Sequence, residues 1–421
     1  MYKLKTLPSG LRVLSVPSKH TAVFSLCVLV GTGSKYESQR LNGISHFLEH
    51  MFFKGTKHRP TPGDVARTLD GIGAQYNAFT SKEVTGYWVK ASREHFDLVL
   101  NVVSDIVTNS LLSHEEIEKE RGVIIQELRM RNDDPQSRAW ILFEQLLWGD
   151  QPAGWPVIGT EENIKNFSQE DFAHYFKHQY SAKNSLVIVS GAFPKNGQEK
   201  IKKAFTSIAR SKASTKKRVA FAQKEPRVLI EEKSIEASNI ILGFPAFSMY
   251  DKRRFALRLL SVILGGNMSS RLFTEVRDRR GLAYYVSASP MLYTDSGYIE
   301  ISAGVPHDKV ATTIDVIGEE LRRLKRDGVS ATELKSAKDY VRGNTAIEME
   351  DSSSLASFFG EQALFKKDIQ EPSELLRTMD RVTEKEIQKL ARDLFEGVQA
   401  NVVIVGYNQD VSTIKKLLRN I

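Results

Sequence analysis

The feature that most constrains the fold of this chain is an internal repeat, because two copies of one pattern require two copies of one structural unit. Residues 86–92 alternate apolar and polar side chains as a half-buried strand does, and residues 94–109 carry apolar side chains at helical spacing. Residues 297–303 and 310–321 repeat this strand and helix, and the two Gly-Tyr strand starts are 211 positions apart. The sequence therefore predicts two similar halves.

The connection between the halves is predicted near residues 211–226, a polar and basic stretch. We therefore expect domains at residues 1–215 and 216–421, and a chain of 421 residues is also longer than one hydrophobic core usually serves. Each half mixes antiparallel-looking strands with long helices, which predicts α+β domains. Two such halves facing each other would form a cleft or chamber, the usual place for a functional site.

Composition narrows the class of protein. Cys27 is the only cysteine, which excludes an internal disulfide and favours a reducing compartment, so we expect a cytoplasmic protein. No run of 18 apolar residues occurs, and the first residues resemble neither a secretory signal nor a transit peptide, so no membrane association is expected. The net charge of +8 comes from scattered Lys and Arg, which does not favour nucleic-acid binding.

The segment His46-Phe-Leu-Glu49-His50 has the spacing of a metal site. Residues four apart share a face of a helix, so His46 and His50 can direct their imidazoles at one ion, and zinc is the usual ion for such pairs. Glu49 lies on the same face, where a carboxylate can accept a proton from a metal-activated water. This is the inverted form of the HExxH zinc helix.

A catalytic zinc needs a third protein ligand, and the predicted helix at residues 113–131 offers two glutamates. Glu120 and Glu127 are two turns apart and face the same way. Glu127 stands in an apolar stretch and is the candidate ligand, while Glu120 could orient a ligand from behind. From spacing alone, solvated glutamates explain the pattern equally well.

Together these residues resemble the pitrilysin-type metallopeptidases, which include insulin-degrading enzyme and the mitochondrial processing peptidases. The resemblance covers nearly the whole chain and rests on GISHFLEHMFFKGT and the glutamate pair of the later helix. It implies one Zn²⁺ per chain, bound by His46, His50 and Glu127, with Glu120 behind them. Mn²⁺ or Co²⁺ are alternatives for such a ligand set.

Two further motifs resemble family elements. Residues 73–83 look like the edge strand of the active site, where the backbone at Asn77 and Ala78 would pair with an extended peptide. Residues 270–284 match an arginine–tyrosine element, so the resemblance implies that Arg277 and Tyr284 hold the substrate and stabilise the oxyanion from the second half. The second half has no metal ligands at the corresponding positions.

The sequence therefore predicts a zinc endopeptidase that hydrolyses extended or unfolded peptides in a chamber, with Glu49 as general base. By length the chain is similar to the short family members, which associate in pairs. We expect a homodimer, or a heterodimer with a subunit that lacks the metal motif. The alternative is a non-catalytic scaffold or partner subunit with the same fold.

Overall fold

The computed structural model describes residues 2–366 and 368–421, which form two compact units. Unit 1 comprises Met1–Arg129, Trp155–Lys217 and Thr345–Glu371, and unit 2 comprises Met130–Gly154, Arg218–Asn344 and Pro372–Ile421. The predicted single division at residues 215/216 differs from these units in two segments. Residues 130–154 belong to unit 2 and residues 345–371 to unit 1, so each half contributes a segment to the other unit.

Unit 1 is built on a six-stranded sheet with the order β1-β2-β6-β3-β5-β4. Only β2 and β6 are parallel among its pairs, and the other neighbours are antiparallel. The strands are β1 (Lys3–Thr6), β2 (Arg12–Pro17), β3 (Val23–Val30), β4 (Gln75–Thr80), β5 (Thr85–Ser92) and β6 (Ser185–Gly191).

The helices of unit 1 are α1 (Ile44–Met51), α2 (Asp64–Asp70), α3 (Phe96–Thr108), α4 (His114–Asp133), α6 (Glu161–Asn166), α7 (Gln169–Gln179), α8 (Gly197–Ala204) and α12 (Ser352–Phe365). The last residues of α4, from Met130 onward, belong to unit 2. Short 3₁₀ turns lie at Ser34–Tyr36, Gln39–Leu41, Arg93–His95 and Ala182–Asn184.

Unit 2 repeats this plan with a five-stranded sheet of order β7-β11-β8-β10-β9, in which only β7 and β11 are parallel. Its strands are β7 (Arg227–Glu232), β8 (Ser238–Ala246), β9 (Tyr285–Leu292), β10 (Gly297–Val305) and β11 (Asn401–Gly406). The strand order therefore matches that of β2-β6-β3-β5-β4 in unit 1. The prediction of two similar, mostly antiparallel α+β halves is confirmed.

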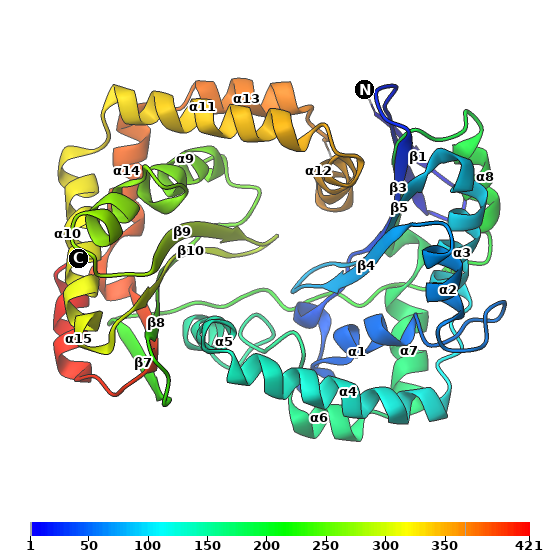
Figure 1. Ribbon diagram of the computed structural model, residues 1–421, viewed down its shortest axis with the longest axis horizontal. Helices are drawn as coiled ribbons and strands as arrows, with labels where there is room; N and C mark the ends of the chain where they lie inside the picture. The colour runs from blue at the N-terminus through cyan, green and yellow to red at the C-terminus, as the bar shows by residue number, and fades with distance from the viewer. Residues whose placement is uncertain (1, 367) are drawn as a thin grey trace. The chain divides into compact units, whose positions relative to one another are not determined.

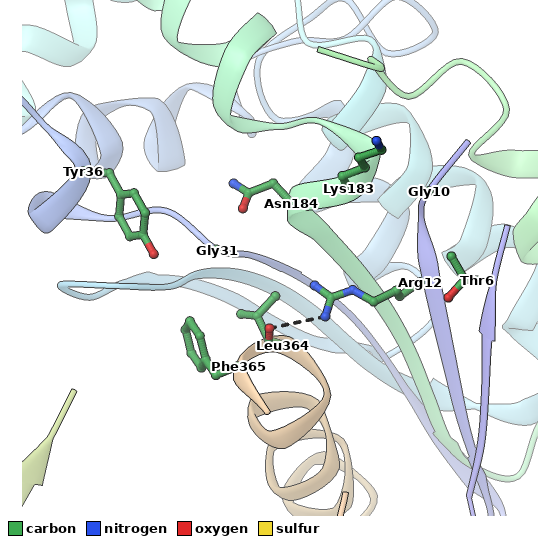
Figure 2. Close-up of a pocket in the computed structure, with 9 residues that line it drawn as sticks. All are labelled: Thr6, Gly10, Arg12, Gly31, Tyr36, Lys183, Asn184, Leu364 and Phe365. Atoms are coloured by element: carbon green, nitrogen blue, oxygen red, sulfur yellow. Dashed lines mark hydrogen bonds between the residues drawn. The ribbon is translucent and has the colours of Figure 1, made fainter. Parts of the chain in front are cut away.

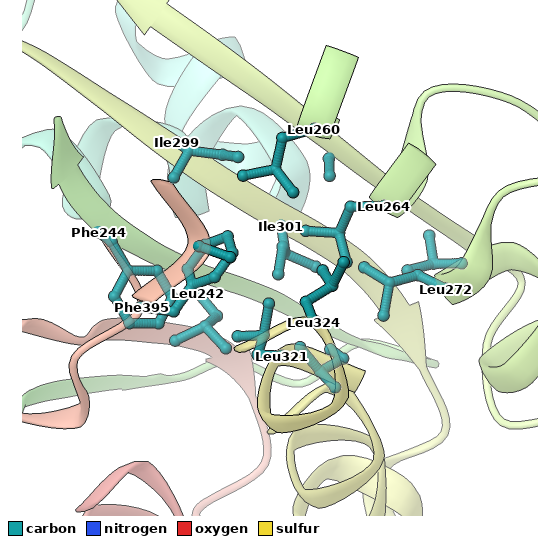
Figure 3. Packing of buried hydrophobic residues seen from close by; sticks show 14 of the residues in the cluster. Leu242, Phe244, Leu260, Leu264, Leu272, Ile299, Ile301, Leu321, Leu324 and Phe395 are labelled. Carbon is teal, nitrogen blue, oxygen red and sulfur yellow. The ribbon is translucent and has the colours of Figure 1, made fainter. Parts of the chain in front are cut away.

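The helices of unit 2 are α5 (Pro135–Trp148), α9 (Arg254–Gly265), α10 (Val310–Asp327), α11 (Ala331–Glu348), α13 (Pro372–Asp380), α14 (Glu384–Leu394) and α15 (Val411–Arg419). The last residues of α11 belong to unit 1. A π-helical segment spans Phe273–Asp278, and 3₁₀ turns lie at His307–Lys309 and Gly397–Gln399. One core of this unit fills the space between its sheet and helices such as α9, α10 and α14 (Figure 3).

The central strands β2, β3 and β6 of unit 1 are buried on both faces, since their successive side chains point to opposite faces and each face packs against a core. Val13 and Leu26 face the core that contains α1 and α3, whereas Leu14 and Cys27 face the core that contains α12. This explains why β3 reads VFSLCVLV without polar alternation.

The exchanged segments supply the helix that covers the second face of each sheet (Figure 1). Helix α12 contacts β2, β3 and β6 of unit 1, and α5 contacts β7, β8 and β11 of unit 2. Asp351 caps the first turn of α12 and forms an ion pair with Lys90 on β5. At the other end of α12, Arg12 Nη1 donates to Ala363 O at 2.5 Å.

Candidate metal centre

Helix α1 carries His46, Glu49 and His50, and a buried carboxylate fixes its first turn. Glu37 is 5% exposed and accepts hydrogen bonds from the backbone N–H groups of Gly43 and Ser45, both at 2.8 Å. Burial raises the pKa of Glu37, whereas its hydrogen bonds with Ser45, Gly43 and Asn42 act to lower it, and a carboxylate is favourable at a helix N-terminus. Glu37, in the segment that leads into α1, therefore holds the start of the helix at Gly43 and Ser45, and Ser45 directly precedes His46.

Helix α4 presents Glu120 and Glu127 to α1, because Ile117, Ile124 and Leu128 bury its neighbouring positions in the same core. Glu120 is buried, with 3% of its surface exposed. The prediction that the two glutamates share a face follows from their seven-residue spacing, which is nearly two helical turns.

The structure brings His46, His50 and Glu127 together. One ligand atom from each lies within 4.8 Å of the others, and this is the only such group among the described residues. The Nε2 atom of His46 is 3.6 Å from Glu127 Oε1, and Nε2 of His50 is 3.4 Å from Glu127 Oε2.

These separations fit a shared metal ion. Two ligand atoms that each lie about 2.0–2.1 Å from a tetrahedral zinc ion are ~3.3 Å apart. Direct N–H···O hydrogen bonds are usually shorter, at about 2.7–3.2 Å. Two imidazoles and one carboxylate are also a donor set that zinc accepts, with a position left for water or substrate.

Glu120 holds the other ring nitrogen of His50. Nδ1 of His50 is 2.9 Å from Glu120 Oε1, and Lys54 Nζ is 2.6 Å from Glu120 Oε2. Burial alone would raise the pKa of Glu120, but hydrogen bonds from His50 and Lys54 outweigh burial and lower it. Glu120 is therefore a carboxylate that orients His50 so that Nε2 faces Glu127.

The pKa of His50 itself is perturbed by its neighbours. Burial alone would lower it, but the hydrogen bond to Glu120 and the carboxylate of Glu127 raise it to about 9. His46 differs, since its buried Nδ1 has no hydrogen-bond partner among the described residues. Only one of the two imidazoles is thus oriented by a carboxylate through its second nitrogen.

Glu49 is outside the three-residue cluster and is held by the edge strand. Thr80 Oγ1 on β4 donates a hydrogen bond of 2.6 Å to Glu49 Oε2. The Glu49 charge also contributes to raising the pKa values of the buried Tyr87 and Tyr180, although burial is the largest cause for both. The carboxylate of Glu49 therefore connects α1 with β4.

Strand β4 is the edge of the unit 1 sheet, because it pairs with β5 alone among the described strands. The side chain of Asn77 is exposed, and its Oδ1 accepts a hydrogen bond of 2.8 Å from the backbone N–H of Ala78. An edge strand presents unpaired backbone groups to an incoming chain. A peptide that pairs with Ala78 would have to displace this local hydrogen bond.

Arg277 and Tyr284 lie in unit 2. Arg277 is in the π-helical segment, with its guanidinium carbon 4.8 Å from the ring centroid of Phe273. Tyr284 is 67% exposed, and its backbone N–H donates to Gly304 O. The roles that the resemblance implies for these two residues stay predictions.

Sequence reasoning missed three residues of this centre, namely Lys54, Thr80 and Glu37. Lys54 follows His50 by four residues but lies beyond the end of α1 at Met51, so helical spacing does not predict its contact with Glu120. Thr80 lies two residues after Ala78 on β4, so the side chains of both point to the face of the sheet on which α1 lies. No local pattern indicates Glu37, because its partners are the backbone N–H groups of Gly43 and Ser45 and the side-chain amide of Asn42.

Comparison with known proteins identifies the family. Residues 12–161 match the family model of insulinase (peptidase family M16), and residues 166–341 match that of the peptidase M16 inactive domain. The chain belongs to the M16 peptidase family, which confirms the resemblance to pitrilysin-type metallopeptidases. The part matched by the inactive-domain model contains none of His46, His50 and Glu127.

Curated relatives and solved structures agree with this assignment. The chain is 33% identical to the uncharacterized zinc protease YmxG of Bacillus subtilis, covering 94% of this chain and 96% of the relative. It is 31% identical to an uncharacterized zinc protease of Streptomyces coelicolor, over 96% of this chain and 89% of the relative. The structure of a protease from Helicobacter pylori superposes with a TM-score of 0.91 at 26% identity, covering 96% of this chain and 99% of that one.

A Pseudomonas fluorescens structure described as a peptidase M16 inactive domain shares the fold. Its TM-score is 0.89 at 16% identity, over 97% of this chain and 98% of that one. As for membranes, the described helices include none with the length and apolar character that crossing a bilayer requires.

Proposed function

We propose that this protein is a zinc-dependent endopeptidase whose single metal ion is bound by His46, His50 and Glu127. The observation that carries the proposal is the convergence of their three ligand atoms within 4.8 Å on α1 and α4. When bound, zinc supplies Lewis acidity that lowers the pKa of a water molecule and polarises a peptide carbonyl. The zinc protease names of the relatives support this choice of metal.

Glu49 is the proposed general base. It accepts the proton of the attacking water and then donates that proton to the leaving amine nitrogen. Its hydrogen bond to Thr80 fixes one carboxylate oxygen and leaves the other available for the proton. Glu120 acts through His50 and is a positioning residue, since it contacts the imidazole and not the reacting atoms.

The proposed substrate is an extended peptide that adds a strand to the open edge of β4. Such pairing is made through the backbone at Asn77 and Ala78, so it selects for unfolded segments more than for a particular side chain. From the family resemblance we propose that Arg277 and Tyr284 stabilise the bound peptide and the oxyanion. The enclosing chamber, the homodimer and the cytoplasmic location also stay predictions.

The test is hydrolysis of a quenched fluorescent peptide by the purified chain alone. Glu49→Gln should keep zinc binding and lose activity by ~10²–10⁴-fold, because general-base catalysis is worth about that factor. A Glu49→Gln variant with full activity would refute the role of Glu49. A zinc-loaded wild-type chain that cleaves no peptide would favour the scaffold or partner-subunit alternative.

A further inference from the structure

A cavity of about 540 Å³ in unit 1 lies where β2 and β6 begin and α12 ends (Figure 2). Its size is within the range of about 300–1,000 Å³ that small-molecule sites occupy. Two cationic side chains, Arg12 and Lys183, line the cavity, and none of the described residues that line it carries a carboxylate. The cavity is therefore electrostatically suited to an anion.

Arg12 is half-buried and has no anionic partner among the described residues. Its Nη1 donates to the carbonyl oxygens of Ala363 at 2.5 Å and Leu364 at 3.3 Å, and no ion pair of Arg12 occurs within the described residues. Burial lowers the pKa of Arg12, as expected for a charge that is partly removed from water. A guanidinium that is partly removed from water is stabilised by an anionic partner.

Capping of α12 does not use all the donors of Arg12. A guanidinium has five N–H donors in a planar fork, and the hydrogen bonds to the described residues come from Nη1 alone. The Nε and Nη2 donors form an edge of the kind that binds a carboxylate in a bidentate way. Capping of α12 therefore uses only some of the hydrogen-bond donors of Arg12.

Lys183 supplies the second positive charge. Its stem lies over Gly10, where an added Cβ would be 2.6 Å from Lys183 Cγ, and the φ of +92° at Gly10 also favours glycine. Lys183 is exposed and forms no ion pair with the described residues. Its ammonium group can thus move toward a ligand without breaking an existing pair.

The rest of the wall is partly apolar. Phe365 and Leu364 at the end of α12 line the cavity opposite Lys183 and Asn184, and Tyr36 also lines it (Figure 2). Inorganic anions would gain nothing from these surfaces, whereas an anion with an apolar group would bury it there.

We propose that this cavity binds a carboxylate attached to an apolar group, with Arg12 and Lys183 holding the carboxylate and Phe365 and Leu364 contacting the apolar group. A free carboxylic acid and the C-terminus of a peptide ending in an apolar residue share this chemistry. The site is separate from the residues of the metal centre and does not depend on peptidase activity.

The experiment is calorimetric titration of the full chain with N-acetyl-L-phenylalanine and with its uncharged amide. We expect saturable binding of the acid and at least ~10-fold weaker binding of the amide, since charge-assisted hydrogen bonds are the strong ones. Arg12→Gln should weaken binding at least ~10-fold and Lys183→Met less, as expected for a bidentate and a single contact. Lys195→Met, an exposed lysine outside the cavity, is the matched control and should change nothing.

Two further arms make the result decisive. A blocked tetrapeptide ending in a free phenylalanine carboxylate tests the peptide source, and the proposal holds whether it binds or only the small acid binds. Equal affinity for acid and amide, tighter binding of inorganic phosphate, or no binding to the folded wild-type chain overturns it. Binding that Arg12→Gln and Lys183→Met both retain but His46→Gln loses also overturns it, because the ligand would then occupy the metal centre.

Discussion

Zinc binding should be strongly pH-dependent, because the metal must displace a proton from His50. A pKa of about 9 means that about one hundred metal-free molecules have a protonated His50 for each neutral one at pH 7. Since zinc binds only the unprotonated Nε2, its apparent affinity at pH 7 is reduced ~100-fold by this group alone. Between pH 7 and pH 8 the affinity should therefore rise ~10-fold, with about one proton released per zinc bound.

The assay is competition for zinc against a chromophoric chelator of known pH dependence, with proton release measured calorimetrically in two buffers of different ionisation enthalpy. Glu120→Gln removes one of the groups that raise the pKa of His50, so its proton release at pH 8 should be smaller than that of the wild type. His174→Gln alters an exposed histidine outside the cluster and should leave the slope unchanged. An affinity that is the same at pH 7 and pH 8, without proton release, would show that zinc does not displace a proton from His50.

Two other predictions concern the support of Glu49 and the exchanged helix. Thr80→Val removes the 2.6 Å hydrogen bond to Glu49, so turnover should fall ~10-fold. Zinc affinity, measured by the same competition assay, should stay unchanged. A parallel loss of zinc affinity would indicate a structural effect instead. A chain that ends at Lys217 lacks α12 and exposes one face of the sheet, including Leu14, Val16 and Ile188. Each such side chain contributes ~1.5–3 kcal/mol when buried. The free energy that burial of the whole face contributes is therefore comparable to the ~5–15 kcal/mol stability of a domain. This fragment should show no cooperative thermal unfolding by circular dichroism unless residues 345–371 are added.

The repeat and the metal spacing were predictable because both are local patterns. His46, Glu49 and His50 lie within two helical turns, and Glu127 was accessible through its spacing from Glu120 together with the family resemblance. The exchange of α5 and α12 was not predictable. Periodicity shows that a helix has an apolar face, but it does not show which of two similar sheets that face covers.

The hydrogen bonds behind the metal centre were also not predictable from the sequence. The contact between Thr80 and Glu49 joins a strand to a helix 31 residues away, and the contact between Lys54 and Glu120 joins the segment after α1 to α4. Each depends on distances that only the packed unit defines. The unpartnered Nδ1 of His46 is likewise a property of the packed core and not of the motif.

The most direct measurement of the central claim is anomalous X-ray scattering from crystals of the zinc-loaded protein, collected on both sides of the zinc absorption edge. We expect one strong anomalous peak per chain, about 2.0–2.2 Å from Nε2 of His46, Nε2 of His50 and a carboxylate oxygen of Glu127. The peak should disappear in a Glu127→Ala variant that keeps its fold. A peak bound by other residues, or none at these three side chains in zinc-loaded crystals, would show that His46, His50 and Glu127 are not the zinc ligands.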